Sequence, residues 1–390
     1  MGYMGDLICY NESGRAWVEI DPGAVVHNAH ALKALLPDGC EMMAVVKTDA
    51  YGHGAAGIAK MLWDEGVRAF AVATVDEGVD LRKEGITGNI LVLGYAPACH
   101  AVVLADNELE LAVVDGVHAR ELDGTGVKLR VHIAIDTGMH RFGVEPRNIA
   151  EIEDIFRCRN LTVVGTGSHL AVPDSQDSGD VEFTNRQIKL FYDTIDALRE
   201  KGHDVGKVHV QASYAVCNYP GLQCDYARIG IMLYGVMSDY SQVKVRPDLR
   251  PVLSLRARIA QVRCVEAGES VSYGRIYSTA RPSKLATVCI GYADGVSRQM
   301  SGNGGMCIVN GIKVPVVGRV CMDLLMIDVT DAGCVRAGDA VTLIGRDGGA
   351  EIRCEDFAAA SGTITNEVLC RLGGRLPRVI LKSKEAAGHG

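Results

Sequence analysis

Short apolar runs alternate with amphipathic stretches from Glu41 to about Tyr234. The runs are rich in valine, isoleucine and leucine, and several stretches between them have helical periodicity. Short buried strands that alternate with helices predict βαβ units and a parallel sheet. Eight such units fit a compact (β/α)8 barrel. The predicted strands are Glu41–Lys47, Ala69–Ala73, Ile90–Leu93, Leu111–Val114, Lys128–Ile135, Leu161–His169, Val208–Gln211 and Tyr226–Ile229, and the clearest helices are Ala55–Glu65, Val75–Glu84, Asn148–Phe156 and Glu182–Glu200.

The pattern changes after about residue 245. Pro247 and Pro251 mark a linker, helical periodicity fades, and polar and apolar residues alternate as in half-buried strands. Asn310 and Gly311 form a two-residue hairpin signal between two of these strands. The pattern predicts a mainly antiparallel β domain. Its predicted strands are Ser254–Val265, Lys284–Gly291, Cys307–Val309, Lys313–Arg319, Leu324–Val329 and Ala340–Ile344.

The predicted fold class is therefore α/β, with a (β/α)8 TIM-type barrel followed by a mainly antiparallel β domain. We place the barrel domain at residues 15–245 and the β domain at residues 246–390. The segment Arg15–Asp21 is strand-like and precedes the first helix. We expect this strand to pair with the β domain rather than to join the barrel.

Composition narrows the functional classes. Of the 390 residues 48% are apolar, which excludes a disordered chain. The net charge of −8 and the lack of a basic run argue against a nucleic-acid partner or a membrane surface. The longest stretch without an acidic or basic residue, 86–105, contains Gly88 and Pro97 and is too broken to span a bilayer. No signal peptide is evident. Thirteen cysteines without a CxxC pair indicate reduced, mostly buried thiols in a cytoplasmic protein, and no metal site.

Lys47 ends the first apolar strand of the predicted barrel and precedes a turn that contains Tyr51 and Gly52. Barrel enzymes place their active sites at this C-terminal mouth. A partly desolvated lysine can lose its proton and form a Schiff base with a carbonyl compound. The alternative is a surface lysine at a strand end, which is the commoner case for a lysine considered alone.

The last strands offer a phosphate site. Arg228 to Ile231 end the eighth strand, and Ser213 follows the seventh. Barrels often hold phosphate in these two loops through backbone N–H groups and small residues. An ordinary strand-end glycine at Gly230 is the alternative. His169 ends the sixth strand, where a lone histidine is more often a satisfied polar group than a catalyst.

Five motifs, in order, resemble those of the alanine racemase family, whose members hold pyridoxal phosphate (PLP). The resemblance runs from about Arg15 to Val379, nearly the whole chain. Five ordered motifs across two domains are a specific signal. The motifs are Ala44-Val45-Val46-Lys47-Thr48-Asp49-Ala50-Tyr51-Gly52-His53-Gly54, Asp136-Thr137-Gly138-Met139-His140-Arg141, Val271-Ser272-Tyr273-Gly274, Gly291-Tyr292-Ala293-Asp294-Gly295 and Gly318-Arg319-Val320-Cys321-Met322-Asp323.

The resemblance implies four catalytic residues. Lys47 would bind PLP covalently and act as one base, and Tyr273 would act as the second base in the barrel of a partner subunit. Arg228 would face the pyridine nitrogen, with His169 as its support. Racemisation needs proton transfer on both faces of a planar carbanion, which a lysine and a tyrosine on opposite faces provide. A homodimer with shared active sites follows from this arrangement.

The resemblance also implies binding roles around PLP and a small amino-acid substrate. Residues at the two late loops and after the first strand would hold the phosphate, and others would contact the ring or the substrate. The phosphate group would bind Tyr51, Ser213, Gly230 and Ile231, Tyr292 would line the same region, Arg141 would lie beside the phenolic oxygen and the substrate, and Met322 and Asp323 would lie near the substrate carboxylate.

Two positions depart from the common family pattern. Ala134 stands where many members carry a carbamylated lysine that supports the arginine, so Arg141 needs another support, either His140 or a bound anion. Asn366 stands where a tyrosine is usual. Both changes resemble the serine/alanine racemases of vancomycin-resistance systems, which are typically the cytoplasmic part of a longer protein with a membrane domain. The chain would then be a stand-alone relative or an excised catalytic piece.

The leading interpretation is a PLP-dependent racemase of serine and alanine, and the nearest alternative is a racemase for alanine alone. A barrel-type PLP decarboxylase shares the two-domain plan but not the motifs. A single-domain PLP-binding barrel lacks a β domain and a counterpart of Tyr273. We expect Asn366 to line the substrate wall. The alternative is that Asn366 caps a helix that begins at Glu367.

Overall fold

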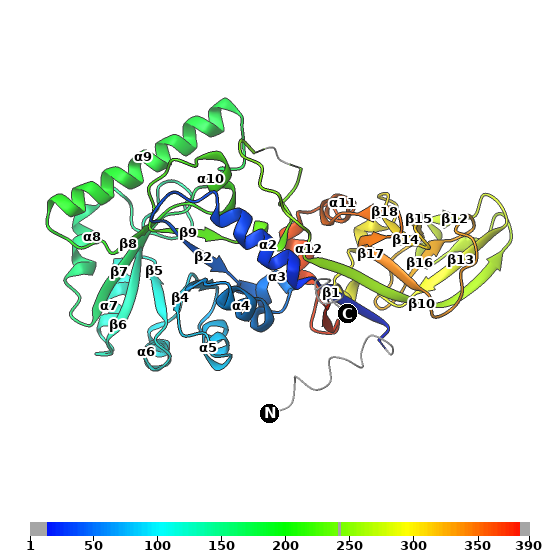
Figure 1. Cartoon of the computed structure of the whole chain (residues 1–390), viewed down its shortest axis with the longest axis horizontal. Helices are drawn as coiled ribbons and strands as arrows, with labels where there is room; N and C mark the ends of the chain where they lie inside the picture. The colour runs from blue at the N-terminus through cyan, green and yellow to red at the C-terminus, as the bar shows by residue number, and fades with distance from the viewer. Residues whose placement is uncertain (1–13, 241–242, 383–390) are drawn as a thin grey trace, which may run out of the picture.

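A computed structural model describes residues 14–240 and 243–382. The N-terminal domain is an eight-stranded parallel sheet in the order β8-β7-β6-β5-β4-β3-β2-β9 (Figure 1, blue to green). The sheet closes where the Arg228 N–H donates to the Gln211 carbonyl at 3.0 Å. The predicted (β/α)8 barrel is confirmed. Its strands are β2 (Glu41–Val45), β3 (Ala69–Val72), β4 (Asn89–Val92), β5 (Glu110–Val113), β6 (Leu129–Ala134), β7 (Leu161–Gly167), β8 (Lys207–His209) and β9 (Tyr226–Ile229).

Helices cover the outside of the barrel, and several begin at side-chain caps. Thr74 and Glu77 form a reciprocal capping box at the start of α5, and the Asn148 side chain accepts from the Glu151 N–H in α8. The long helix begins at Ser178, four residues before its predicted start. The helices are α2 (Pro22–Lys33), α4 (Ala55–Asp64), α5 (Val75–Lys83), α6 (Ala101–Asp106), α7 (Gly116–Asp123), α8 (Ile149–Phe156), α9 (Ser178–Glu200) and α10 (Ser213–Asn218).

The C-terminal domain is a nine-stranded, mainly antiparallel sheet in the order β18-β17-β14-β15-β16-β13-β10-β1-β19, as predicted. Asn310 and Gly311 both have positive φ, at 51° and 74°, and join β14 to β15 in the predicted hairpin. The strands are β10 (Leu253–Val265), β13 (Ser283–Val288), β14 (Met306–Val309), β15 (Ile312–Val317), β16 (Leu325–Asp328), β17 (Ala340–Asp347), β18 (Ala350–Ile352) and β19 (Arg378–Ile380), with β11 (Ser270–Val271) and β12 (Tyr277–Ser278) as a separate pair.

The two ends of the chain tie the domains together. Strand β1 (Ala16–Ile20) pairs antiparallel with β10 and parallel with β19, so it lies in the C-terminal sheet (Figure 1). From the C-terminal part, α12 (Thr365–Arg371) packs on α3 (Lys47–Gly52) of the barrel. The Arg378 guanidinium donates to the Gly52 carbonyl at 2.9 Å. The C-terminal segment therefore positions the turn that follows Lys47.

The prediction that the cysteines are mostly buried is wrong for the described residues. Cys217, Cys224, Cys307 and Cys354 are buried, whereas Cys99, Cys264 and Cys334 are exposed and five others are partly exposed. All twelve described cysteines are free thiols, and Cys9 lies outside the described residues. Over residues 14–240 and 243–382, no helix has the length and apolar character needed to cross a bilayer.

Candidate active site

A cavity of about 580 Å³ lies at the C-terminal mouth of the barrel. It is lined from nearly every strand of the barrel and from α12. Most of the predicted site residues meet there. They are Lys47, Tyr51, Arg141, His169, Ser213, Arg228, Gly230, Ile231 and Asn366, whereas Tyr273, Tyr292, Met322 and Asp323 do not line it.

A left-handed turn follows Lys47. The four residues 48–51 have φ between 51° and 55°, a conformation that costs roughly 1–2 kcal/mol for each residue with a Cβ. Surrounding groups hold the turn, because the Glu77 carboxylate accepts the Thr48 N–H at 2.6 Å and the Asp49 carboxylate accepts the Ala55 N–H at 2.7 Å. The turn brings Lys47 and Tyr51 to the same cavity.

Lys47 occupies an environment that favours a neutral amine. Burial lowers the pKa of its ammonium group, and the positive charge of Arg141 lowers it further. A neutral amine is the form that attacks a carbonyl carbon or accepts a proton. The environment of Lys47 therefore provides the unprotonated amine that Schiff-base formation requires.

Tyr51, Ser213 and Gly230 form a tight cradle at one end of the cavity. A Cβ on residue 230 would lie 2.8 Å from the Tyr51 phenol oxygen, so only glycine fits there. The Gly230 N–H donates to Ser213 Oγ at 2.9 Å, and the serine hydroxyl hydrogen can donate to a ligand. Burial raises the pKa of the Tyr51 phenol, which keeps it a hydrogen-bond donor. Such a set of donors suits a phosphate group.

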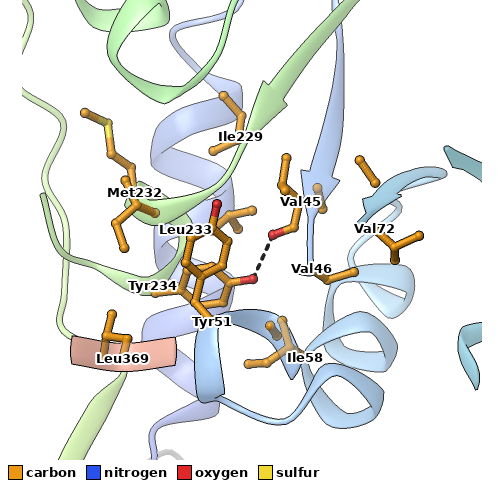
Figure 2. Close-up of a cluster of buried hydrophobic side chains, with 14 of the residues drawn as sticks. Val45, Val46, Tyr51, Ile58, Val72, Ile229, Met232, Leu233, Tyr234 and Leu369 are labelled. Carbon is orange, nitrogen blue, oxygen red and sulfur yellow. Dashed lines mark hydrogen bonds between the residues drawn. The ribbon is translucent and has the colours of Figure 1, made fainter. Parts of the chain in front are cut away.

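Tyr234 packs against this cradle and supports Tyr51. Its phenol donates to the Val45 carbonyl at 2.9 Å, at the end of β2 (Figure 2). The Tyr234 ring also lies 5.1 Å from the Tyr51 ring, centroid to centroid. Figure 2 shows both rings in one buried cluster with Leu369 of α12. The position of Tyr51 is thus set by packing from both domains.

Arg228 is held on several sides at the floor of the cavity. Its Nη1 donates to His209 Nδ1 and to the His209 carbonyl at 2.9 Å. Its Nη2 donates to the Ser168 carbonyl at 2.6 Å and to His169 Nδ1 at 3.3 Å. Burial lowers the pKa of Arg228 to about 10, so the group stays charged at neutral pH. The Nε–H is the remaining donor of the guanidinium.

His169 lies beside Arg228, as the resemblance implied. Burial lowers the pKa of His169 to about 3, and the positive charges of Arg228 and Arg141 act in the same direction. The imidazole is therefore neutral, and its Nδ1 accepts from Arg228. It supports the guanidinium by a hydrogen bond rather than by charge.

Sequence reasoning missed a second group of polar residues inside the barrel. His209 contacts Arg228 directly, His132 Nδ1 lies 2.8 Å from His209 Nε2, and His132 Nε2 lies 2.9 Å from Glu110 Oε2. Gly165 and Gly167 of β7 leave room for the two imidazoles. Histidines in two strands that flank a Gly-x-Gly strand are the signal that could have revealed this group.

Arg141 follows β6, where Ala134 presents only a methyl group to the cavity. His140 Nδ1 lies 3.3 Å from the Asp136 carboxylate, so His140 pairs with Asp136 instead of supporting Arg141. Among the described residues, no hydrogen bond or ion pair holds the Arg141 guanidinium. The bound anion stays a prediction.

Asn366 is the second residue of α12, and Ile364 occupies the cap position. The alternative that Asn366 caps this helix is therefore wrong. Its side chain lines the cavity, and its buried Oδ1 accepts no hydrogen bond from the described residues. An unsatisfied buried acceptor costs about 1–3 kcal/mol. A ligand that donates a hydrogen bond would relieve this cost.

Four predicted residues lie on the β domain, outside the cavity of their own chain. Tyr273 is 70% exposed, Tyr292 43% and Met322 54%. Hydrogen bonds bring their three segments together. Ser272, next to Tyr273, donates from its hydroxyl to the Arg319 carbonyl at 2.7 Å. The Tyr292 N–H donates to the carbonyl of Cys321, next to Met322, at 3.0 Å. Asp323 pairs with Arg375 at 2.6 Å. Together they form an exposed surface with apolar side chains.

Residues 20–238 match the family description "Alanine racemase, N-terminal domain", and residues 252–380 match "Alanine racemase, C-terminal domain". The chain belongs to the alanine racemase family. It is 38% identical to an alanine racemase of Desulfosudis oleivorans, over 95% of this chain and 98% of that one. It is also 38% identical to an amino-acid racemase of Enterococcus faecalis, over 94% of this chain but only 51% of the relative. The chain thus spans about half the length of that relative.

Solved alanine racemases share the fold along almost the whole chain. The enzyme of Clostridium difficile 630 superposes with a TM-score of 0.87 at 34% identity, covering 96% of this chain and 97% of that one. The Bacillus anthracis alanine racemase, solved with bound L-Ala-P, has the same TM-score and identity over 95% of this chain and 96% of that one. The family and the fold predicted from the motifs are confirmed.

Proposed function

We propose that this chain is a PLP-dependent racemase that interconverts the L and D forms of alanine and serine. The proposal rests on one observation, a single cavity that brings together three chemical groups. It holds the desolvated amine of Lys47, the phosphate cradle around Gly230, and the anchored guanidinium of Arg228. The relatives named alanine racemase and amino-acid racemase support the reaction class.

The residues present fit PLP. Because residue 230 is a glycine, no side chain crowds the phenol of Tyr51 or the hydroxyl of Ser213, which would donate to the phosphate, and Lys47 would hold the cofactor covalently. Arg228 would face the pyridine nitrogen, and Arg141 would lie near the phenolic oxygen. When bound, PLP supplies an electron sink for the charge left at Cα. A permanently protonated Arg228 disfavours a proton on the ring nitrogen.

The protein would move the proton with two bases. Lys47 Nζ would take or return the Cα proton on one face of the substrate. The partner subunit's Tyr273 would do so on the other face, through its phenol oxygen. The exposed surface around Tyr273 supports a twofold dimer, because this tyrosine lies outside the cavity of its own chain. With a base on each face of the substrate, neither base has to move to the other face during racemisation.

Asn366 supports serine as a substrate beside alanine. Its Oδ1 lacks a hydrogen-bond partner among the described residues, and the side chain lines the cavity. The hydroxyl of serine can donate to such an acceptor, whereas the methyl group of alanine cannot. A racemase for alanine alone is the second candidate, favoured by the name alanine racemase that several relatives carry.

Two measurements on one preparation test the proposal. Racemisation of L-alanine and L-serine is followed by chiral chromatography, with PLP present. We expect turnover of both substrates, and turnover of alanine alone would favour the second candidate. Borohydride treatment of the PLP-loaded protein should label Lys47, as peptide mapping would show. A label on another lysine, or no turnover of either amino acid, would contradict the proposed function.

A further inference from the structure

We propose that Glu110 is a positioning residue that acts on the active site from inside the barrel. Its carboxylate sets the tautomers of His132 and His209, and these tautomers present an acceptor nitrogen to Arg228. The consequence for catalysis rests on the proposed function. The tautomers themselves are a property of the cofactor-free protein and can be measured independently.

The four side chains form a continuous hydrogen-bonded row across four strands of the barrel. Glu110 begins β5, and His132, His209 and Arg228 lie in β6, β8 and β9. Each of the four residues is at most 5% exposed. Arg228 and both histidines line the active-site cavity, whereas Glu110 lines a second cavity with Arg130. The row therefore connects the reaction site to a region outside it.

The directions of these hydrogen bonds are fixed by the chemistry of the two ends. A guanidinium can only donate, so His209 Nδ1 must accept from Arg228. A neutral imidazole whose Nδ1 carries no proton has its proton on Nε2. His209 Nε2–H therefore donates to His132 Nδ1, and the two nitrogens lie 2.8 Å apart. His132 then also carries its proton on Nε2, which donates to Glu110 Oε2 at 2.9 Å. One assignment satisfies every contact.

The charge states agree with this assignment. Burial lowers the pKa of His209 well below its ordinary value, and the charge of Arg228 acts in the same direction, so His209 is neutral. Burial alone raises the pKa of the Glu110 carboxyl, but hydrogen bonds from His132 and Arg130 outweigh it and lower the pKa. Glu110 is thus an ionised carboxylate, which can only accept.

The barrel is built around this row. A Cβ on residue 165 would lie 2.3 Å from His132 Nδ1, and one on residue 167 would lie 2.1 Å from His209 Cε1. Two glycines of β7 therefore make the space in which the imidazoles meet. Barrel interiors are normally filled by layers of apolar side chains. A fully satisfied polar row in their place holds its members in one arrangement.

An amide at position 110 would reverse the direction of the hydrogen bonds along the row. Arg130 donates to Glu110 Oε1, so the oxygen of a glutamine would stay with Arg130 and its amino group would face His132 Nε2. Both histidines would then carry their protons on Nδ1. His209 would present an N–H to the N–H of Arg228, and two donors in contact repel. Arg228 would move away from the position that the proposed reaction requires.

The test is the tautomeric state of the two histidines in cofactor-free protein labelled with ¹⁵N-histidine. Long-range ¹H–¹⁵N spectra distinguish the two tautomers, and His132→Asn and His209→Asn spectra assign the signals. We expect both histidines of the wild-type protein to be Nε2–H tautomers at neutral pH. In Glu110→Gln we expect the Nδ1–H form of both. An Nδ1–H or doubly protonated ring in the wild type, or unchanged tautomers in Glu110→Gln, would overturn the proposal.

Arg130 provides the matched control. Arg130→Met removes the ion pair on Glu110 but leaves the wild-type tautomers. In Glu110→Gln/Arg130→Met the amide oxygen is free to turn to His132, so the Nε2–H forms should return. Racemisation by the PLP-loaded proteins should follow the tautomers, with kcat/KM about tenfold lower in Glu110→Gln and largely restored in the double variant.

Loss of activity in Glu110→Gln that the double variant does not restore, while its tautomers do return, would contradict the link to catalysis. Far-ultraviolet circular dichroism and thermal unfolding of each variant separate this result from misfolding. If even the wild-type protein racemises neither amino acid, the proposed function fails. The tautomer result would stand in that case, because it is obtained without cofactor.

Discussion

The phenol oxygen of Tyr51 leaves no room for a side chain on residue 230. A Cβ there would lie 2.8 Å from this oxygen and 3.7 Å from Val45 Cβ. Tyr51 cannot yield easily, because it belongs to the left-handed turn after Lys47 and packs against Tyr234. The cradle proposed for the phosphate therefore depends on an absent methyl group.

Gly230→Ala should weaken the binding of PLP. The added methyl group would displace either the Tyr51 phenol or the backbone N–H that donates to Ser213. We expect an increase in the dissociation constant of about tenfold or more, or about 1.4 kcal/mol. Titration of cofactor-free protein with PLP, followed by absorbance, measures it. Gly349→Ala is the control, since no atom lies within 4 Å of a Cβ there, and equal affinity in both variants would refute the role of Gly230.

Lys47→Met should stabilise the cofactor-free protein at neutral pH. Because the pKa of Lys47 in the folded state is lowered from its ordinary 10.5, protonation of this amine favours the unfolded chain. The cost of charging the buried amine penalises folding at neutral pH, and this penalty shrinks as the pH rises from the folded-state pKa of Lys47 to 10.5, above which it is lost. We expect a melting temperature about 2 °C or more above wild type at neutral pH.

The gain from Lys47→Met should shrink as the pH rises, because the wild-type penalty shrinks. Scanning calorimetry at several pH values gives this dependence. Lys60→Met is the matched control, because Lys60 is exposed and pairs with Asp64 at 2.7 Å on the surface of α4. A gain that does not vary with pH would show that packing, rather than protonation, is responsible.

The sequence predicted the architecture well for a physical reason. Runs of valine, isoleucine and leucine mark strands buried on both faces, and the Asn310-Gly311 pair marks a hairpin by its preference for positive φ. Chemically distinctive residues at strand ends, such as Lys47 and Arg228, could be placed at one mouth of the barrel because all parallel strands end there. The family motifs then assigned roles that position alone leaves open.

Three features were not predicted from the sequence. Residues 48–51 have no glycine, so nothing local predicts a left-handed turn, which Glu77 holds from a later element. Glu110 and His132 lie in different strands, β5 and β6, and only the barrel brings their side chains into contact inside it. The start of α12 was misplaced because Ile364, a residue with no capping side chain, occupies the cap position. In each case a tertiary contact outweighs the local signal.

Inactive subunits should complement each other if the active sites are shared. Tyr273 is 70% exposed on the β domain and lies outside the cavity of its own chain. In a mixed dimer of Lys47→Ala and Tyr273→Phe subunits, one site carries both defects and the other carries neither. Equal mixing gives half mixed dimers, so about a quarter of the wild-type activity should return.

Mass spectrometry of the mixture confirms that the subunits have exchanged. The control is a mixture of the Lys47→Ala subunit with a subunit that carries both substitutions, in which every site keeps a defect. Absence of any recovery after confirmed exchange would count against a shared site and in favour of a tyrosine that serves no neighbouring barrel.

Asn366→Tyr should lower kcat/KM for L-serine more than for L-alanine. The substitution removes the buried Oδ1 that has no partner among the described residues, and fills part of the cavity wall with a ring. A pocket that loses its hydrogen bond to a substrate hydroxyl discriminates against that substrate, whereas the methyl group of alanine loses nothing. We expect the serine-to-alanine ratio to fall by a factor on the order of ten or more.

Steady-state assays with both substrates on the same variant preparation give this ratio directly. Asn366→Ala is the informative companion, because it removes the acceptor without adding the ring. If the hydrogen bond is the cause, the ratio should fall in both variants. A fall in Asn366→Tyr alone would assign the effect to the volume of the ring. An equal loss of kcat/KM for the two amino acids in both variants, with unchanged melting temperatures, would show that Asn366 does not determine the choice of substrate.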